Sequence, residues 1–160
     1  GSSIGFFKIN SEREFLKAIK ANKKITDEIL IEEYIEGREI TVPIIGKRAL
    51  PIIEIKPQNK VYDYDSKYTP GKSECIVPAS IDLEIKDRIN KESIDIYSKV
   101  GCSDYSRLDF ILSKDDIPYF LELNTYPGMT ETSLFPKSAL SCSIGFDELM
   151  SELVSMQLKR

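Results

Sequence analysis

The chain has 160 residues, 41% of them hydrophobic, which is enough to bury one sizeable core in a single domain or in two tightly joined lobes. Its net charge of −4 combines 22 basic residues, spread along the chain, with 26 acidic ones, so we expect neither nucleic acid nor an anionic membrane as a partner. The absence of histidine and the 3 widely spaced cysteines disfavour a zinc site and a disulfide framework, and leave carboxylates, cations, backbone amides or a metal for any catalysis.

The first predicted elements, in chain order, are a Gly/Ser loop, a short apolar strand and a helix. The loop and the strand take up residues 1–10. Ser11 and Glu14 then have the spacing of a capping box, at the start of a helical stretch whose apolar residues share one face. Three β-branched runs with tight turns between them predict a meander of strands, at residues 28–35, 39–46 and 48–57.

The next stretch, residues 58–80, is long, polar and aromatic without periodicity, so we expect a candidate active-site loop there. Isoleucine and valine side chains form a helical stripe over 82–100, and Gly101 is expected to end that helix in a left-handed conformation. Two strands and two amphipathic helices follow, at residues 105–113, 117–124, 133–140 and 146–158. Together these elements predict an α+β fold with an antiparallel sheet.

Polar side chains interrupt the two apolar strands in this last part of the chain. Because side chains alternate along a strand, Arg107 and Asp109 share one face of the first strand. Glu122 and Asn124 share one face of the second strand for the same reason. If the strands form a hairpin that turns symmetrically about residues 115–116, Asp109 lies opposite Glu122 and Arg107 lies opposite Asn124.

Two directly opposed carboxylates repel each other unless a cation lies between them or one of them is protonated. Asp109, Glu122 and the Asn124 carbonyl are hard oxygen donors that suit Mg²⁺ or Mn²⁺. Because Mg²⁺ commonly completes its coordination with phosphates and water, the pattern points to a nucleotide. The alternative is a solvated sheet face on which these side chains are merely exposed.

The second strand is followed at once by Pro127 and Gly128, which stop it and let the backbone approach a ligand closely. The N–H of Gly128 could then face developing negative charge. Ser133 stands at an N-cap position with Pro136 in the first helical turn, so a carboxylate could bind at that helix end. An ordinary capped helix is the alternative interpretation of Ser133.

Three further stretches are ambiguous. Residues 1–5 could cradle a phosphate, although such a stretch is more often a turn. Residues 67–68, a lysine and a tyrosine, could lie over phosphates or form a solvated loop tip. A group of glutamates could either line a charged edge or accept hydrogen bonds from adenine and ribose: Glu32, Glu33, Glu36 and Glu39.

Taken together and in this order, "GSSIGFFKI", "EEYIEGREITV", "YDYDSKYT", "SRLDFIL" and "ELNTYPGMTETSLFPK" resemble the ATP-grasp part of D-alanine–D-alanine ligases. The resemblance covers essentially the whole chain and implies an ATP-grasp fold, in which α+β lobes clasp ATP between antiparallel sheets. It implies that residues 1–35 belong to the first lobe and that residues 36–160 form the second lobe, with the active-site loop at 58–80. The family's N-terminal domain is missing from this sequence, so we expect the isolated chain to be inactive or nearly so.

The resemblance also implies roles for individual residues. Residues expected to bind ATP are Ser3, Glu32, Glu33, Tyr34, Ile35, Glu39 and Lys67. Those expected to bind the metal are Asp109, Glu122 and Asn124. The tetrahedral intermediate would be stabilised by Arg107 and the Gly128 N–H, while Ser2 and Tyr68 would close a loop over the site. The carboxylate of the second D-alanine would bind Ser133 and Leu134.

The implied activity is the ATP-dependent ligation of two D-alanines through an acylphosphate, for peptidoglycan precursors, with Mg²⁺ or Mn²⁺ as the metal. No membrane span or secretory leader is visible, so we expect a cytoplasmic protein, and the resemblance allows a homodimer of the full-length enzyme. Two alternatives stay open. One is an ATP-grasp carboxylate–amine ligase with another substrate, and the other is a non-catalytic remnant that binds only nucleotide or nothing.

Overall fold

The computed structural model describes residues 5–57 and 73–158 of the chain. The chain divides into two compact units. Unit 1 comprises Gly1–Ile35 with Pro57–Ser73, and unit 2 comprises Glu36–Lys56 with Glu74–Arg160. No helix among the described residues has both the length and the apolar character that crossing a membrane requires.

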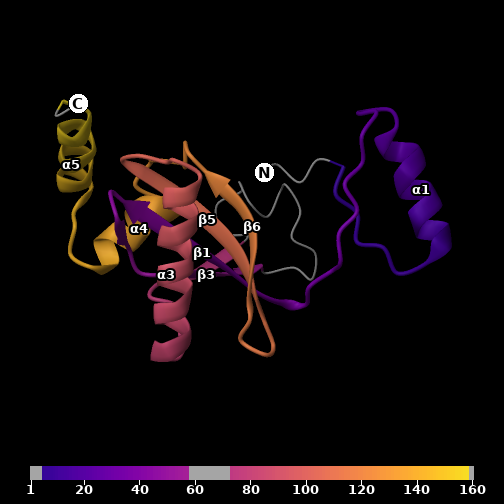
Figure 1. Ribbon diagram of the computed structural model, residues 1–160, viewed down its shortest axis with the longest axis horizontal. Helices are drawn as coiled ribbons and strands as arrows, with labels where there is room; N and C mark the ends of the chain where they lie inside the picture. The colour runs from indigo at the N-terminus through magenta and orange to yellow at the C-terminus, as the bar shows by residue number, and fades with distance from the viewer. Residues whose placement is uncertain (1–4, 58–72, 159–160) are drawn as a thin grey trace. The chain divides into compact units, whose positions relative to one another are not determined.

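The described residues of unit 1 contain one helix, α1 (Glu12–Asn22), labelled in Figure 1, which begins where the capping spacing predicted. Ser11 is the N-cap, and its hydroxyl accepts a hydrogen bond from the Glu14 N–H at 3.3 Å. The Glu14 carboxylate reaches back to the N–H of Asn10, at 2.8 Å, rather than to that of Ser11. Two orphan donors at the helix start are thus satisfied, as in a capping box.

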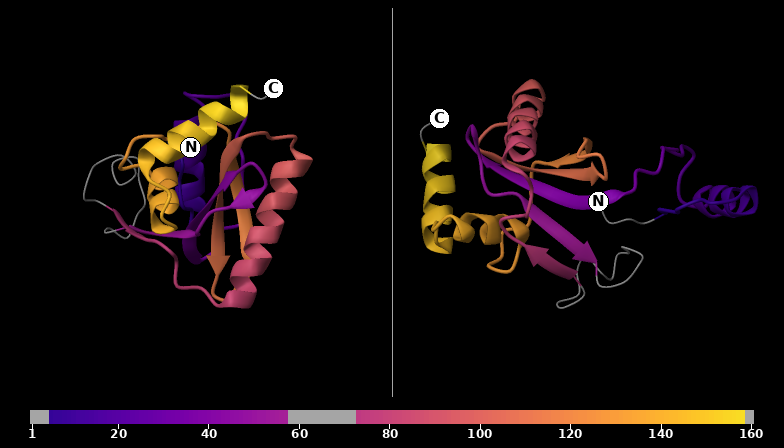
Figure 2. Two further views of the ribbon diagram at one scale, coloured as in Figure 1. Left: turned by 90° about the vertical axis from the view of Figure 1, so that its left-hand side faces the viewer. Right: turned by 90° about the horizontal axis from the view of Figure 1, so that it is seen from below.

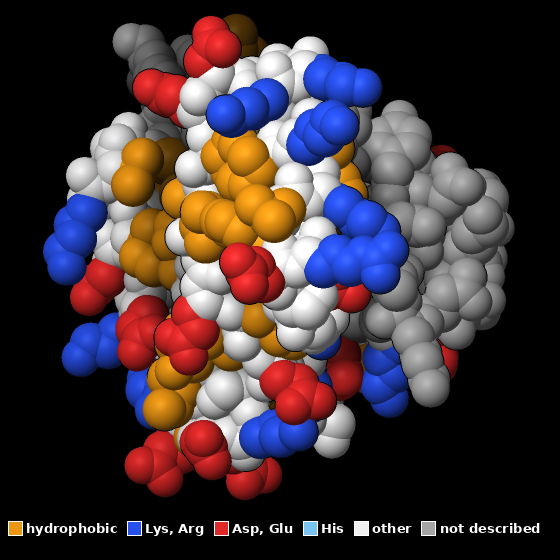
Figure 3. Space-filling view, turned by 90° about the vertical axis from the view of Figure 1, so that its right-hand side faces the viewer, with side chains coloured by type: hydrophobic (Ala, Val, Ile, Leu, Met, Phe, Trp, Pro, Cys, Tyr) orange, Lys and Arg blue, Asp and Glu red, His pale blue; other side chains and the backbone are white. Residues whose placement is uncertain are grey.

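The strand predicted at 28–35 is not formed, and residues 6–10, in the described part of the first predicted strand, have no strand pairing either. A strand requires a hydrogen-bonded neighbour, and β-branched composition alone does not supply one. Apolar side chains in these segments stay exposed, with Phe6 at 64% and Leu30 at 80%. Figure 3, which faces the α1 end of the chain, shows apolar side chains at the surface among Lys and Arg side chains.

Unit 2 is built on one sheet with the strand order β4-β3-β1-β5-β6, with β2 paired to the end of β1. The pairings of β1 with β2, β3 and β5, and of β5 with β6, are antiparallel, as the α+β prediction required. The strands are β1 (Gly37–Ile45), β2 (Arg48–Ala49), β3 (Ile53–Pro57), β4 (Ser73–Ile76), β5 (Tyr105–Ser113) and β6 (Pro118–Asn124). The helices are α3 (Leu83–Lys99), α4 (Leu134–Ser141) and α5 (Phe146–Leu158).

The long stretch at 58–80 differs from a continuous loop, because β4 lies within it. This strand is only four residues long and begins with two polar residues, so it gave no recognisable period in the sequence. Residues 58–72 lie outside the described part of the chain.

The stripe predicted for α3 is only partly correct, since Ile89 is fully buried whereas Val100 is 62% exposed. Gly101 has the expected positive φ, +78°.

Two hydrophobic clusters cover different faces of the sheet. Alternate residues of β1 and β5, such as Ile40 and Leu108, pack against Ile89 and Tyr97 of α3. Figure 2 shows α3 lying along one face of the sheet. On the other face, a second cluster joins the end of β1 to α4 and α5 and consists of Ile45, Leu50, Phe135, Ala139, Leu149 and Leu153. The polar side chains of β5 and β6 share that second face with the buried Ile53 and Ile55 of β3.

Candidate active site

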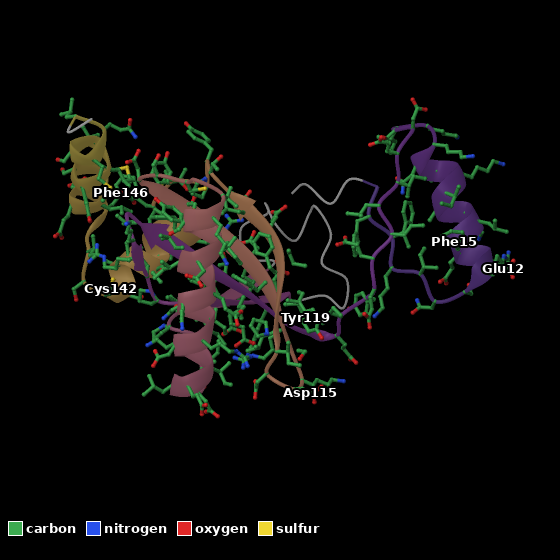
Figure 4. All side chains as sticks on the ribbon, viewed as in Figure 1. Glu12, Phe15, Asp115, Tyr119, Cys142 and Phe146 are labelled. Atoms are coloured by element: carbon green, nitrogen blue, oxygen red, sulfur yellow. The ribbon has the colours of Figure 1, made fainter. Side chains whose placement is uncertain are left out.

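The hairpin of β5 and β6 has the register predicted at its polar positions. Asp109 pairs with Glu122, and Arg107 pairs with Asn124. Asp115 lies in the turn at the tip of this hairpin, as Figure 4 shows. On its other side β5 pairs with β1, where Thr41 lies opposite Asp109. The buried Leu108 faces α3, so these polar residues occupy the opposite face of the sheet.

The pairing changes just beyond the polar positions. Phe110 faces Phe120, so Leu121 is an extra residue in β6, and the register shifts between Asp109 and Phe110. The Phe110 and Phe120 rings meet edge to face, with centroids 5.6 Å apart. Such a bulge bends a strand locally and can re-aim the side chains next to it.

Asp109 is the centre of the polar group and is only 8% exposed. Its Oδ1 accepts hydrogen bonds from the Thr41 hydroxyl at 2.6 Å and from Arg107 Nε at 2.9 Å. Its Oδ2 accepts from Arg107 Nη2 at 2.7 Å and from Asn124 Nδ2 at 3.1 Å. The Asn124 amide also donates to Glu122 Oε1, at 3.2 Å. One amide nitrogen therefore joins both carboxylates, and all of these side chains converge.

This donor set fits a hard divalent cation. The single nitrogen shared by Asp109 and Glu122 keeps their oxygens close together, and rotation of the Asn124 amide would present its oxygen at the same point. No cluster of three or more His, Cys, Asp or Glu side chains suited to a metal occurs within 5–57 and 73–158, so the set is two carboxylates and an amide. Mg²⁺ commonly accepts so few protein ligands. Arg107 supplies the positive charge beside Asp109 in this structure.

A second polar group lies where β6 leads into α4. Ser133 is the N-cap of α4, as predicted, but its hydroxyl makes no capping hydrogen bond. Instead Ser133 Oγ accepts from the Thr130 N–H at 3.1 Å and lies 2.8 Å from Thr130 Oγ1. A Cβ at Gly128 would come within 2.9 Å of Ser133 Oγ, so the absence of a side chain at Gly128 allows this close packing. Leu134 is the first residue of α4.

The residues expected at the adenine lie in unit 1, in an irregular segment at 32–35. The Nζ of Lys8 lies 3.6 Å from the centre of the Tyr34 ring, within the range of a cation–π contact. Glu39 lies in β1 of unit 2, opposite Ile55 and Ile111. The remaining expected site residues lie outside the described residues: Ser2, Ser3, Lys67 and Tyr68.

Two features of unit 2 were missed in the sequence. The first is Thr41, which is fully buried and donates a hydrogen bond to Asp109. The sequence indicated it only by a hydroxyl residue within the apolar run of β1. The second feature is an ion pair on the other sheet face, where Arg38 Nη2 lies 2.7 Å from Glu54 Oε2. The hydrogen bond from Arg38 lowers the pKa of the Glu54 carboxyl, and the same bond raises the pKa of Arg38.

Comparisons with known proteins test the expected family and fold. A family model described as "D-ala D-ala ligase C-terminus" matches residues 1–155. Similar curated proteins are D-alanine–D-alanine ligases of Halalkalibacterium halodurans, 42% identical over 100% of this chain and 54% of the relative, and of Fervidobacterium nodosum, 46% identical over 96% and 50%. The Bacillus anthracis ligase complexed with ATP superposes with a TM-score of 0.83 at 36% identity, over 98% of this chain and 51% of that one. The VanG D-Ala:D-Ser ligase of Enterococcus faecalis has a TM-score of 0.82 at 30% identity, over 98% and 46%. The expected fold class is thereby confirmed, and the chain spans about half the length of the relatives it matches.

Proposed function

Because the chain belongs to the family described as the D-alanine–D-alanine ligase C-terminus, we propose that it forms the metal- and ATP-binding part of a ligase that joins two D-alanines. The observation that carries this proposal is the convergence of Asp109, Glu122 and Asn124 on one sheet face, with Arg107 bonded to the same carboxylate. On a merely solvated sheet face, nothing would offset the free-energy cost of burying the Asp109 carboxylate to this extent.

The proposed reaction has two steps. First, a carboxylate oxygen of one D-alanine attacks the γ-phosphorus of ATP, the bond to the bridging oxygen breaks, and ADP leaves. Next, the amine of the second D-alanine attacks the acylphosphate carbon and loses a proton, and inorganic phosphate leaves with its bonding electron pair. The products are D-alanyl-D-alanine, ADP and phosphate. Both steps depend chiefly on positioning and on neutralising negative charge.

Asp109, Glu122 and Asn124 would hold the metal, which we propose to be Mg²⁺ or Mn²⁺. When bound, such an ion would neutralise the phosphate oxygens during transfer. The chain's own contribution is a fixed set of oxygen ligands, since Asp109 is held from both neighbouring strands by Thr41 and Asn124.

Arg107 and the Gly128 N–H would face the oxyanion of the tetrahedral intermediate. The guanidinium has a defined direction here because Asp109 binds it through two nitrogens, at 2.9 and 2.7 Å. At the start of α4, the Ser133 hydroxyl and the Leu134 N–H would bind the carboxylate of the second D-alanine. That position suits an anion because first-turn N–H groups of a helix lack intrahelical partners.

The nucleotide would be bound by Ser3, Lys67 and Glu39 together with the segment 32–35. Ser2 and Tyr68 would close a loop over the reacting groups. For the whole protein we propose a cytoplasmic enzyme, because its substrates ATP and D-alanine are small and water-soluble, and a homodimer, which the family resemblance supports.

Calorimetric titration of the chain with ATP·Mg²⁺ tests the binding part of the proposal. Glu122→Gln should weaken binding of the metal nucleotide about tenfold or more, because it removes the charge of one ligand. Glu92→Gln is the matched control, since the same change is made on α3 at a surface ion pair with Arg88. Equal affinity of the two variants would contradict the metal site.

The ligase activity of the whole protein is tested by ATP-dependent phosphate release with D-alanine, D-serine and D-lactate as separate second substrates. Release with D-alanine is expected. A preference for D-serine would instead favour an activity like that of the D-Ala:D-Ser ligase to which this chain is similar. Nucleotide binding without phosphate release from any of the three would support a non-catalytic remnant.

A further inference from the structure

Thr41 is a buried polar residue for which the proposed reaction has no direct use. It lies in the middle of β1, is 0% exposed, and stands opposite Asp109 in the register of β1 and β5. Its hydroxyl oxygen lies 2.6 Å from Asp109 Oδ1 and 3.1 Å from the carbonyl oxygen of Leu108. A hydroxyl has one proton to donate, and the shorter distance to a charged acceptor assigns that proton to Asp109.

The contacts of Asp109 divide between its two oxygens. Oδ1 is turned towards β1, where it accepts from the Thr41 hydroxyl and from Arg107 Nε. Oδ2 accepts from Arg107 Nη2 and is turned towards β6, where Asn124 Nδ2 connects it to Glu122. Because Arg107 bonds both oxygens, it is Thr41 and Asn124 that distinguish one from the other. The hydroxyl of Thr41 thus occupies the oxygen on the β1 side and leaves Oδ2 on the side of the other expected metal ligands.

Thr41 is better suited than Arg107 to fix this orientation. A threonine side chain is β-branched and has one torsion to fix, and here it is fully buried between neighbouring strands. The Arg107 side chain is long, has several torsions and is 20% exposed. A guanidinium bound through two nitrogens can also move together with the carboxylate, so on its own it does not determine which way Asp109 turns.

We propose that Thr41 is a positioning residue that turns Asp109 so that Oδ2 is the one oxygen it offers to the divalent cation. This inference rests on the proposed function, because it concerns the same metal site. The competing explanation is that the Thr41 hydroxyl only satisfies the Leu108 carbonyl inside the sheet. That explanation predicts an effect on folding but none on metal binding.

Mn²⁺ alone serves as the probe, with the free ion measured by electron paramagnetic resonance during titration of the whole 160-residue chain. Thr41→Val keeps the shape of the side chain and removes the hydroxyl, and it should weaken Mn²⁺ binding about 10- to 100-fold. Thr41→Ser keeps the hydroxyl and should stay within about threefold of the parent chain. Ser93→Ala is the control, because it removes a fully buried hydroxyl, bonded to the Ile89 carbonyl at 2.7 Å, from α3 on the other sheet face.

Urea unfolding of each variant separates a folding defect from a metal defect. If Thr41→Val does not fold, Thr41→Ala takes its place in the titration. Alanine also lacks the hydroxyl, and it does not put a second methyl group in its position. Mn²⁺ binding by the folded hydroxyl-free variant within twofold of the parent would overturn the proposal. So would equal weakening by the serine and valine variants, since keeping the hydroxyl would then make no difference to Mn²⁺ binding. If the parent chain binds no Mn²⁺, the metal assignment in the proposed function fails, and the role of Thr41 fails with it.

Discussion

The ion pair of Arg38 and Glu54 allows a prediction that depends on no ligand. Arg38 Nη2 donates to Glu54 Oε2 at 2.7 Å and to the carbonyl of Ser80 at 2.8 Å, so it links β1, β3 and the segment before α3. The Glu54 side chain is only 8% exposed, whereas that of Arg38 is 37% exposed. Replacing Arg38 by methionine keeps most of the apolar stem and leaves a buried carboxylate without its main partner.

The expected loss follows from this burial. Removing one partner of a fully buried pair typically costs about 3–5 kcal/mol, and a hydrogen bond to a charged group contributes about 1.5–3 kcal/mol. The Arg38 guanidinium is reached by water, which screens the pair, so we expect Arg38→Met to lower the free energy of unfolding by about 2 kcal/mol. The double variant Arg38→Met/Glu54→Leu should recover most of this loss, because no buried charge is then left unpaired.

The same pair predicts a pH dependence. Arg38 lowers the pKa of Glu54, so the stability contributed by this carboxylate is complete above the unfolded pKa and is lost as the pH falls through the lower folded pKa. The parent chain should therefore lose stability as the pH falls below about 4.3, the usual glutamate value, and Arg38→Met should lose less over that interval.

Urea unfolding followed by circular dichroism, repeated across this pH interval, measures both effects. A loss below about 0.5 kcal/mol in Arg38→Met, the range of an ordinary surface change, would refute the reasoning. The same would follow if parent and variant lost stability equally on acidification.

Three further predictions concern single substitutions. In the whole protein, Arg107→Ala should lower kcat of phosphate release about 10²- to 10³-fold, as loss of an oxyanion donor typically does, and an unchanged kcat would contradict its role. Ser106→Ala should leave the free energy of unfolding unchanged or raise it by about 1 kcal/mol, because the buried Ser106 hydroxyl has no hydrogen-bond partner among the described residues. Urea unfolding checks this, and a clear loss of stability would mean that the hydroxyl is bonded. Gly128→Ala should displace the Ser133 hydroxyl, which a Cβ would approach to 2.9 Å. The KM for the second D-alanine should then rise about 2- to 10-fold, while calorimetry finds nucleotide binding unchanged. Weaker nucleotide binding would argue against a local effect.

The β5–β6 hairpin was predictable because its information is local. Alternation along each strand and a turn at residues 115–116 were enough to place Asp109 opposite Glu122. The pairing of β1 with β5 connects residues 68 positions apart in the case of Thr41 and Asp109. No local pattern encodes such a contact. The sequence therefore did not reveal Thr41 as a neighbour of Asp109.

The failed predictions have the same origin. Residues 28–35 have the composition of a strand, but composition cannot supply the neighbour that a strand must bond. Ser133 was correctly placed at a helix start, yet its hydroxyl bonds Thr130 rather than capping the helix. Which of two nearby donors a hydroxyl chooses depends on loop geometry that the sequence pattern does not contain.

The bulge at Leu121 has a practical consequence for protein engineering. It lies between the paired carboxylates and the hairpin tip, and the packed rings of Phe110 and Phe120 hold the register on its far side. A short insertion at the exposed turn residues 115–116 would therefore change the hairpin only between the turn and the bulge. That turn is a suitable place for an affinity peptide or a fluorescent label that leaves the spacing of the acidic residues intact.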